Sequence, residues 1–253
     1  MDDLDHTDYS ILWNAINFVV NSSNDDFRNH VDEYFDLPVV IDYYLFVTVL
    51  GALDNTGKNM YWAVYDCQKD KKITPAIWDL DMTVGSYALE HIKTEFASPE
   101  FDLGYVIGLV SRLNQLNVDG FKEKVRKRYQ ELRPTFFSPT HLVNRYTTYY
   151  NMLKESGAAK REEERWSGDS DVYGMDISFD DEIQYINDWI IRRIDYLDRN
   201  YFNYQEPTDI QQMIAGDDTH LQDVFYNMAG QRIRQSDLPQ HGIFIHNGKK
   251  FVR

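Results

Sequence analysis

The sequence has one cysteine, a deficit of basic residues and no long apolar run. Cys67 stands alone, which excludes an internal disulfide and a cysteine-rich metal site. Lys and Arg number 26 against 41 Asp and Glu, so the formal net charge is −15 at pH 7. Because nucleic-acid phosphates and anionic membranes would repel such a surface, neither is expected as a partner. No run approaches the ~20 apolar residues that cross a bilayer, so no membrane span is predicted.

The first fifty or so residues lack further residue types. Residues 1–5 are acidic, whereas a secretory signal begins basic and then turns apolar, so no signal peptide is predicted in this chain. Glycine first occurs at Gly51 and lysine at Lys58. Residues 9–20 already have the apolar spacing of an amphipathic helix, as the interior of a domain would. Taken literally the chain is cytoplasmic, but Met1 is open to being an internal residue of a longer protein.

What is present indicates a globular protein with a substantial core. The 253 residues are 43% hydrophobic and 15% aromatic, enough for one sizeable domain and an appendage. Apolar periodicity predicts a mainly helical α+β fold with one short hairpin. Helices are expected over residues 9–20, 39–50, 103–116, 118–132, 138–154, 158–166 and 179–202.

The chain is organised around residues 39–85. Residues 39–50 predict a helix that is buried nearly all round, with Asp36 as its cap, Pro38 in its first turn and Gly51 at its end. Strands over residues 60–65 and 73–78 should then form a hairpin. Apolar neighbours predict that the ring of Trp78 is buried against the 39–50 helix.

Two pairs of polar side chains flank this hairpin. Asp54 and Asn59 stand five positions apart, the spacing of base and metal-binding Asn in the protein-kinase catalytic loop. Asp79 and Asp81 are two apart, so an extended chain points both to the same side. Hard divalent cations such as Mg²⁺ prefer these oxygen ligands. We expect the four side chains to converge, although Asp-Asn-x-Gly is also ordinary turn chemistry.

Two motifs carry a resemblance to a known family: Leu53-Asp54-Asn55-x-x-Lys58-Asn59-x-Tyr61 and Ile77-Trp78-Asp79-Leu80-Asp81-x-x-x-Gly85. Over about residues 25–201 the chain closely resembles the spore-coat CotH family of atypical, secreted bacterial protein kinases. The resemblance departs at Val84, where an aromatic residue commonly precedes the glycine.

The resemblance implies a function and a location. Asp54 would be the catalytic residue, and Asn59 with Asp79 or Asp81 would hold Mg²⁺ or Mn²⁺. ATP would be the phosphoryl donor, and a secreted or surface protein would be the acceptor. The chain itself would be extracellular or on the cell surface.

A nucleotide-binding N-terminal lobe is not recognisable in this sequence. Kinases hold ATP under a strand-rich lobe with a Gly-rich loop and a strand Lys. Before Asp54 the only basic side chain apart from histidine is Arg28. Residues 1–205 therefore predict a kinase-like C-terminal lobe without its N-terminal lobe, inactive alone. The alternative is a pseudokinase-like secreted or surface protein that binds or builds structure without catalysis.

The C-terminal residues differ in kind from the rest. Residues 206–221 have the composition of a linker, and residues 222–253 predict a small β-rich tail. Asn247-Gly248 between two alternating runs is a strong hairpin signal. The tail resembles modules that end many secreted bacterial surface proteins.

One basic cluster interrupts the acidic chain. It lies on the expected helix 118–132 and comprises Lys122, Lys124, Arg126, Lys127 and Arg128. A solvated helix face explains it, and an anion or substrate site is the alternative.

Overall fold

A computed structural model of the protein describes residues 8–66, 68–87, 92–93, 96–97, 108–168 and 178–205, and four strands between residues 224 and 252. The chain divides into two compact units, Met1–Tyr204 and Gln205–Arg253. The predicted linker, residues 206–221, lies outside the described residues.

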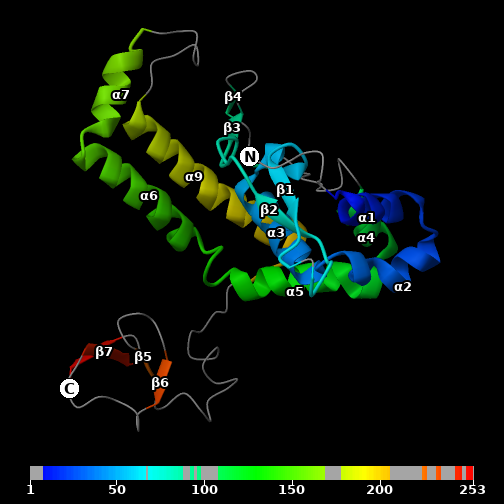
Figure 1. Ribbon diagram of the computed structural model, residues 1–253. Helices are drawn as coiled ribbons and strands as arrows, with labels where there is room; N and C mark the ends of the chain where they lie inside the picture. Colours follow the sequence, from blue (N-terminus) through cyan, green and yellow to red (C-terminus); the bar gives the residue numbers. More distant parts are fainter. Residues whose placement is uncertain are drawn as a thin grey trace. The chain divides into compact units, whose positions relative to one another are not determined.

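The first unit is built from helices and two small sheets (Figure 1). Its helices are α1 (Ser10–Asn21), α2 (Asn24–Tyr34), α3 (Leu37–Leu50), α4 (Leu109–Leu116), α5 (Phe121–Leu132), α6 (Pro139–Glu155), α7 (Ala158–Trp166) and α9 (Phe179–Leu197). Shorter turns are η2 (Leu53–Thr56), η3 (Val118–Gly120) and η4 (Asp198–Phe202). Strand β1 (Met60–Ala63) pairs antiparallel with β2 (Thr74–Ile77), and β3 (Ser86–Tyr87) with β4 (Ile92–Lys93). The predicted mainly helical α+β class is confirmed.

Helix α3 begins and ends at the residues that local chemistry favours. The Asp36 carboxylate accepts a hydrogen bond from the Val39 N–H at 3.3 Å, which caps the first turn. Gly51 ends the helix in the left-handed region, with φ 62°, where a glycine carries no Cβ penalty. Between these ends most apolar side chains are buried, whereas Tyr44 and Phe46 are only partly buried.

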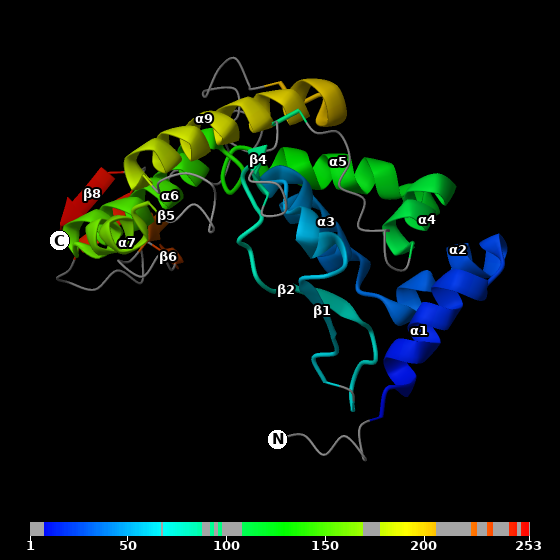
Figure 2. The same cartoon turned by 90° about the horizontal axis from the view of Figure 1, so that it is seen from above.

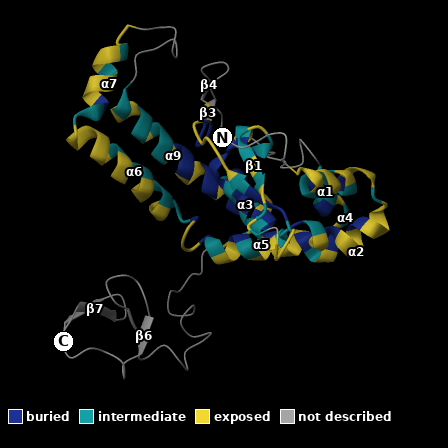
Figure 3. Ribbon diagram, viewed as in Figure 1, coloured by how far each residue is buried: buried dark blue, intermediate teal, exposed yellow. Residues whose placement is uncertain are grey.

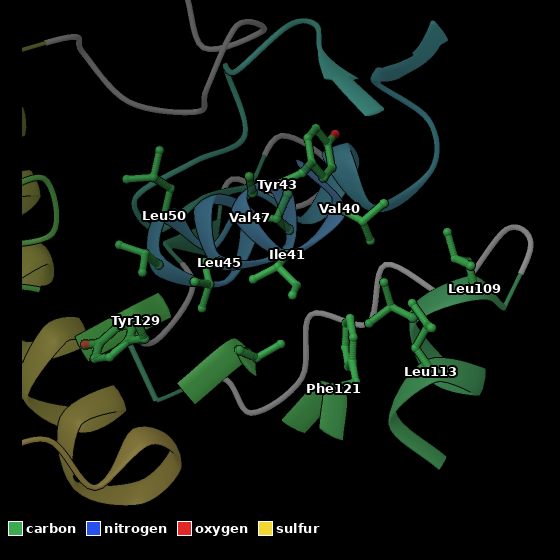
Figure 4. Packing of buried hydrophobic residues seen from close by; sticks show 14 of the residues in the cluster. Val40, Ile41, Tyr43, Leu45, Val47, Leu50, Leu109, Leu113, Phe121 and Tyr129 are labelled. Atoms are coloured by element: carbon green, nitrogen blue, oxygen red, sulfur yellow. The ribbon is translucent and has the colours of Figure 1, made fainter. Parts of the chain in front are cut away.

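Helix α3 forms the centre of the first unit. It contacts β2, α5 and α9, and two views show it lying between the hairpin and helix α5 (Figures 1 and 2). Its side chains point to both sides: Tyr43 lies on the face opposite Leu45 (Figure 4). Buried residues concentrate on α3 and the inner side of α9, while α6 and α7 are largely exposed (Figure 3). Because α3 packs against three other elements, the loop that follows it has a fixed starting point.

The one charged residue of α3 has a partner on α5. Arg128 donates from Nε to Asp42 Oδ1 at 2.7 Å and from Nη2 to Oδ2 at 3.0 Å. This two-bond pair is the geometry in which arginine holds a carboxylate best. In the same basic cluster Lys124 pairs with Asp119. Two of its five cations therefore have structural partners.

Helix α9 sends a buried arginine to the last turn of α3. Arg193 is 1% exposed. It donates to the Thr48 carbonyl from Nε at 3.2 Å and from Nη2 at 2.7 Å, and its Nη1 donates to the Phe96 carbonyl at 2.7 Å. Carbonyls in the last turn of a helix have no partner within it, so Arg193 satisfies one of them and fixes the end of α3.

The β1–β2 hairpin is only partly covered. Thr74 and Pro75 at the start of β2 are buried, but Ile77 at its end is exposed. Trp78 is 59% exposed, so the prediction that its ring is buried is wrong. Burial decreases along β2 toward the end that carries Trp78. The indole instead packs edge-on against Tyr61, with ring centroids 5.6 Å apart.

The second unit is a four-stranded antiparallel sheet. Its strands are β5 (Val224–Tyr226), β6 (Arg232–Arg234), β7 (Ile243–His246) and β8 (Lys249–Val252), in the order β6-β5-β7-β8. The β7–β8 pair closes with His246 opposite Lys249, which confirms the predicted hairpin around Asn247 and Gly248, although these two residues lie outside the described set. Among the described residues, none of the helices combines the length and apolar character required to span a bilayer.

Candidate functional site

The loop after α3 folds back onto the carbonyl of Asp54. That oxygen accepts hydrogen bonds from the Lys58 N–H at 3.0 Å and the Asn59 N–H at 2.9 Å. The Thr56 hydroxyl donates to the Leu53 carbonyl at 2.8 Å and closes the turn from the other side. A separation of five positions in the sequence thereby becomes direct backbone contact between Asp54 and Asn59.

Asn55 joins this loop to the chain that leaves the hairpin. Its side-chain Nδ2 donates to the carbonyl of Asn59 at 2.6 Å and to that of Trp78 at 2.7 Å, with a longer contact to the Asp79 carbonyl at 3.4 Å. Tyr43 of α3 donates its hydroxyl to the Asn55 carbonyl at 2.8 Å. Because one nitrogen reaches both carbonyls, the backbones of Asn59 and of Trp78–Asp79 are neighbours.

This connection lies in the interior. Asn55 is 0% exposed, and burial raises the pKa of the Tyr43 hydroxyl to about 12. The Asn55 Oδ1 atom is buried and accepts no hydrogen bond from any described residue. A buried acceptor without a donor lowers the free energy of unfolding by about 1–3 kcal/mol. An apolar residue at position 55 would avoid this cost, so Asn55 is not explained by stability alone.

The turn that carries Asp79 and Asp81 has unusual backbone angles. Asp79 has φ 54° and Val84 has φ 46°. Asp visits this region with modest strain, but a β-branched residue rarely does. The Val84 N–H donates to the Leu50 carbonyl at 2.7 Å, which ties the turn to the end of α3. Strained backbone of this kind is concentrated at functional sites.

Gly85 closes the turn against α9. It has φ 87°, and a Cβ placed there would lie 2.3 Å from Tyr185 Oη and 2.7 Å from the Trp189 indole. The Tyr185 hydroxyl donates to the Gly85 carbonyl at 3.3 Å. Both the positive φ and the lack of space for a Cβ atom require glycine at this position. Gly85 is the last glycine of the second motif.

Three carboxylates act on one ammonium group. Lys58 Nζ lies 2.8 Å from Asp54 Oδ2, with the Lys58 side chain 75% and the Asp54 side chain 17% exposed. The pKa of Lys58 is raised, first by the hydrogen bond that its ammonium donates to Asp54 and then by the Asp54 charge, with smaller contributions from Asp81 and Asp79. The carboxylates of the loop (Asp54) and of the turn (Asp79 and Asp81) therefore lie close enough to act on the same ammonium group.

The order of these parts is that of a kinase catalytic loop: a buried helix, a turn with Asp and Asn, a hairpin and an Asp-x-Asp turn. The model of the CotH kinase protein family matches residues 1–197. The chain belongs to this family. A search of curated proteins finds no match. As a CotH kinase protein, the chain has a kinase-like first unit.

The CotH chain's four predicted site residues are distributed unevenly. The backbones of Asp54, Asn59 and Asp79 meet at Asn55, whereas the side chains of Asp79 and Asp81 are exposed. Within the described residues, no group of three or more His, Cys, Asp or Glu side chains is arranged to hold a metal ion. The donor set suits Mg²⁺ all the same, because that ion typically uses one or two carboxylates together with substrate phosphates.

Sequence reasoning missed the residues that hold this site together. Asn55 and Lys58 belong to the quoted motif but are not among the predicted site residues, and neither are Tyr43 and Tyr185. A tyrosine in the apolar helix α3 is the one signal available, because a buried Tyr hydroxyl usually has a hydrogen-bond partner. Its partner is a backbone carbonyl, and no sequence pattern marks that.

Proposed function

We propose that this CotH chain carries the phosphoryl-transfer machinery of an atypical protein kinase. ATP is the donor, and a Ser or Thr hydroxyl of a secreted or surface protein is the acceptor. Asp54 is the base, and Asn59 with Asp79 or Asp81 holds Mg²⁺ or Mn²⁺. The observation that carries the proposal is the contact of both motif backbones with one buried side chain, Asn55.

In the proposed reaction Asp54 accepts the proton of the attacking hydroxyl. The hydroxyl oxygen forms the new bond to the γ-phosphorus, the bond to the β–γ bridging oxygen breaks, and ADP leaves with that electron pair. Asn59 and Asp79 or Asp81 would supply the oxygen ligands of the divalent cation. Mg²⁺, if bound there, would neutralise part of the phosphate charge.

Lys58 has a place in this proposal. Its ammonium is bonded to the Asp54 carboxylate, so one oxygen of the base is engaged before substrate arrives. The Lys58 side chain is mostly exposed and free to turn toward an incoming phosphate, which would release Asp54. The same ion pair favours the second candidate function, a pseudokinase-like binding or structural protein, if Lys58 never leaves.

Metal titration tests the ligand roles. We expect the free Mn²⁺ signal in electron paramagnetic resonance to fall on adding the protein, and Asp79→Asn or Asp81→Asn to weaken that binding. Asp32→Asn, an exposed residue of α2, is the matched control and should bind as the unaltered chain does. Mn²⁺ binding that is equally strong in all four proteins would contradict the assignment.

Thermal unfolding separates a ligand role from a structural one. Without metal, like charges on Asp54, Asp79 and Asp81 repel, so Asp81→Asn should leave stability unchanged or slightly raised. If Asp81 instead holds the fold by a charge-assisted hydrogen bond, the change should remove about 1.5–3 kcal/mol. A loss of that size in chelator would overturn the metal role.

Transfer of labelled phosphate tests catalysis. Residues 1–53 contain Arg28 as their only Lys or Arg, so we propose that the 253-residue chain tested alone transfers far below the ~1–100 s⁻¹ of kinases. Asp54→Ala should lower any measured rate by about 10²–10⁴-fold, the share of a general base. Rapid transfer abolished by Asp54→Ala would refute the inactivity and support the base. If the chain binds metal but its phosphate-transfer rate does not change in Asp54→Ala, the pseudokinase alternative is favoured.

We propose an extracellular or cell-surface location, as family membership suggests. The second unit, a four-stranded sheet, is proposed as a module of secreted surface proteins. Fractionation of the native host with an antibody to the chain tests both, and recovery in the cytoplasm would contradict them.

A further inference from the structure

Asn55 occupies an unusual position between the two motifs. It is fully buried, yet its side chain makes no described contact with another side-chain polar atom. Both of its N–H groups point at backbone carbonyls, one in the loop (Asn59) and one in the chain leaving β2 (Trp78). The amide orientation is therefore fixed, because the flipped form would set Oδ1 against two carbonyl oxygens.

Few side chains can make this connection. It needs two donors on one short stem, which excludes Ser, Thr and every apolar residue. A carboxylate of the same shape is an acceptor and would repel both carbonyls. The carboxamide of Asn is the smallest group that satisfies the geometry, and its Oδ1 accepts nothing from the described residues.

The connection crosses the proposed site. Asn59 and Asp79 are separated by the whole hairpin in sequence, and the Asn55 amide is bonded to the backbone of both segments. On the loop side Asp54 precedes Asn55 directly, and its carbonyl accepts the Asn59 N–H at 2.9 Å. Movement of the amide would change the separation of Asn59 from Asp79 and Asp81.

We propose that Asn55 is a positioning residue, which sets the separation between Asn59 and the Asp79–Asp81 turn so that their oxygens can share one divalent cation. It touches neither the metal nor the substrate. This inference rests on the proposed function and adds the residue that assembles its metal ligands. Outer partners of metal ligands typically change affinity by about 10–100-fold when mutated.

A graded series on the full chain tests it, with Mn²⁺ as the probe. The Asn55 side chain has two hydrogen-bond donors. Asn55→Ser keeps one donor, and Asn55→Leu keeps none while the side chain has a similar volume. We expect Mn²⁺ affinity to fall stepwise, by about tenfold or more for Asn55→Leu. Tyr129→Phe is the matched control, because it removes a buried hydrogen bond, from Tyr129 on α5 to Asp198 in η4, that lies outside the loop and the turn. It should keep Mn²⁺ affinity within about twofold while lowering thermal stability.

The outcomes distinguish the inference from the proposed function. Circular dichroism first identifies the folded variants, and Asn55→Ser serves if Asn55→Leu does not fold. If the folded Asn55 variants bind Mn²⁺ unchanged while Asp81→Asn does not bind, the positioning role is wrong and the metal site stands. An equal loss in Tyr129→Phe would mean general damage and would also overturn the role. If the unaltered chain binds no Mn²⁺, the metal site and the role fall together.

Discussion

Helix α3 and the β1–β2 hairpin follow each other along the chain and differ in how they are covered. Helix α3 is apolar and surrounded by β2, α5 and α9, and its Leu45 is 0% exposed. The hairpin is also rich in apolar residues, yet Tyr61, Ile77 and Trp78 are exposed. Similar composition therefore produces a scaffold in one segment and an open surface in the other.

The difference teaches where rigidity comes from in this molecule. The turn with Asp79 is not held by the hairpin alone, which has two strands. It is held at three points: the Asn55 side chain, the Leu50 carbonyl at the end of α3, and Tyr185 of α9. The buried helix supplies the fixed frame, and the exposed hairpin leaves the carboxylates accessible.

The largest expected effect is on the buried side of this comparison. Leu45→Ala removes a fully buried side chain from α3 and leaves a cavity, which should cost about 2–5 kcal/mol of unfolding free energy. Denaturant unfolding measures it, with Leu53→Ala as the control because Leu53 is exposed. Equal losses in both would mean that α3 is not the scaffold.

Gly85→Ala should have the next largest effect. The added methyl would meet Tyr185 and Trp189 within 3 Å, and overpacking of this kind costs about 1–3 kcal/mol. Gly120→Ala is the matched control: its φ is also positive, at 70°, but its nearest atom lies at 3.6 Å. The excess loss at Gly85 isolates the contact with α9, and no excess would contradict it.

Tyr43→Phe should have a smaller effect that depends on pH. Near neutrality it removes one buried hydrogen bond, worth about 1 kcal/mol. The folded pKa of Tyr43 is about 12 against 10.0 unfolded, so the hydroxyl's contribution is complete below pH 10 and is lost as pH rises to 12. The difference between the two proteins should shrink over that window. Other tyrosines titrate in both proteins and cancel, and a constant difference from pH 8 to 12 would refute the burial effect.

Trp78→Ala should have the smallest effect. An exposed ring that packs edge-on against Tyr61 should contribute less than about 1 kcal/mol. A buried Trp would lose about 3–5 kcal/mol, so urea unfolding distinguishes the two readily. A loss of about 3–5 kcal/mol of unfolding free energy in Trp78→Ala would mean that the Trp78 ring is buried after all.

The helices could be predicted because the residues at their ends are typical capping and helix-ending residues. Asp36, Pro38 and Gly51 mark the ends of α3, and Ser138 followed by Pro139 marks the start of α6, where the Ser138 hydroxyl accepts the His141 N–H at 3.1 Å. Trp78 could not be placed, because apolar character predicts burial only where another element covers it. That information belongs to tertiary packing and not to the strand.

The candidate site was predictable in its parts and not in its assembly. Spacing indicated Asp54 with Asn59, and Asp79 with Asp81. The connection through Asn55 joins side chain to backbone, and any residue at position 78 offers the same carbonyl. A contact of that type leaves no pattern in a single sequence.

The hydrogen bonds from Arg193 to the Thr48 carbonyl join residues 145 positions apart, and this separation has a consequence for folding. Contacts so distant form late, because the loop between them must close first. During synthesis α3 and the Asp54 loop leave the ribosome long before α9 does. We therefore expect the last turn of α3 to stay frayed in the nascent chain, so that the acidic site matures only after most of the first unit has been made.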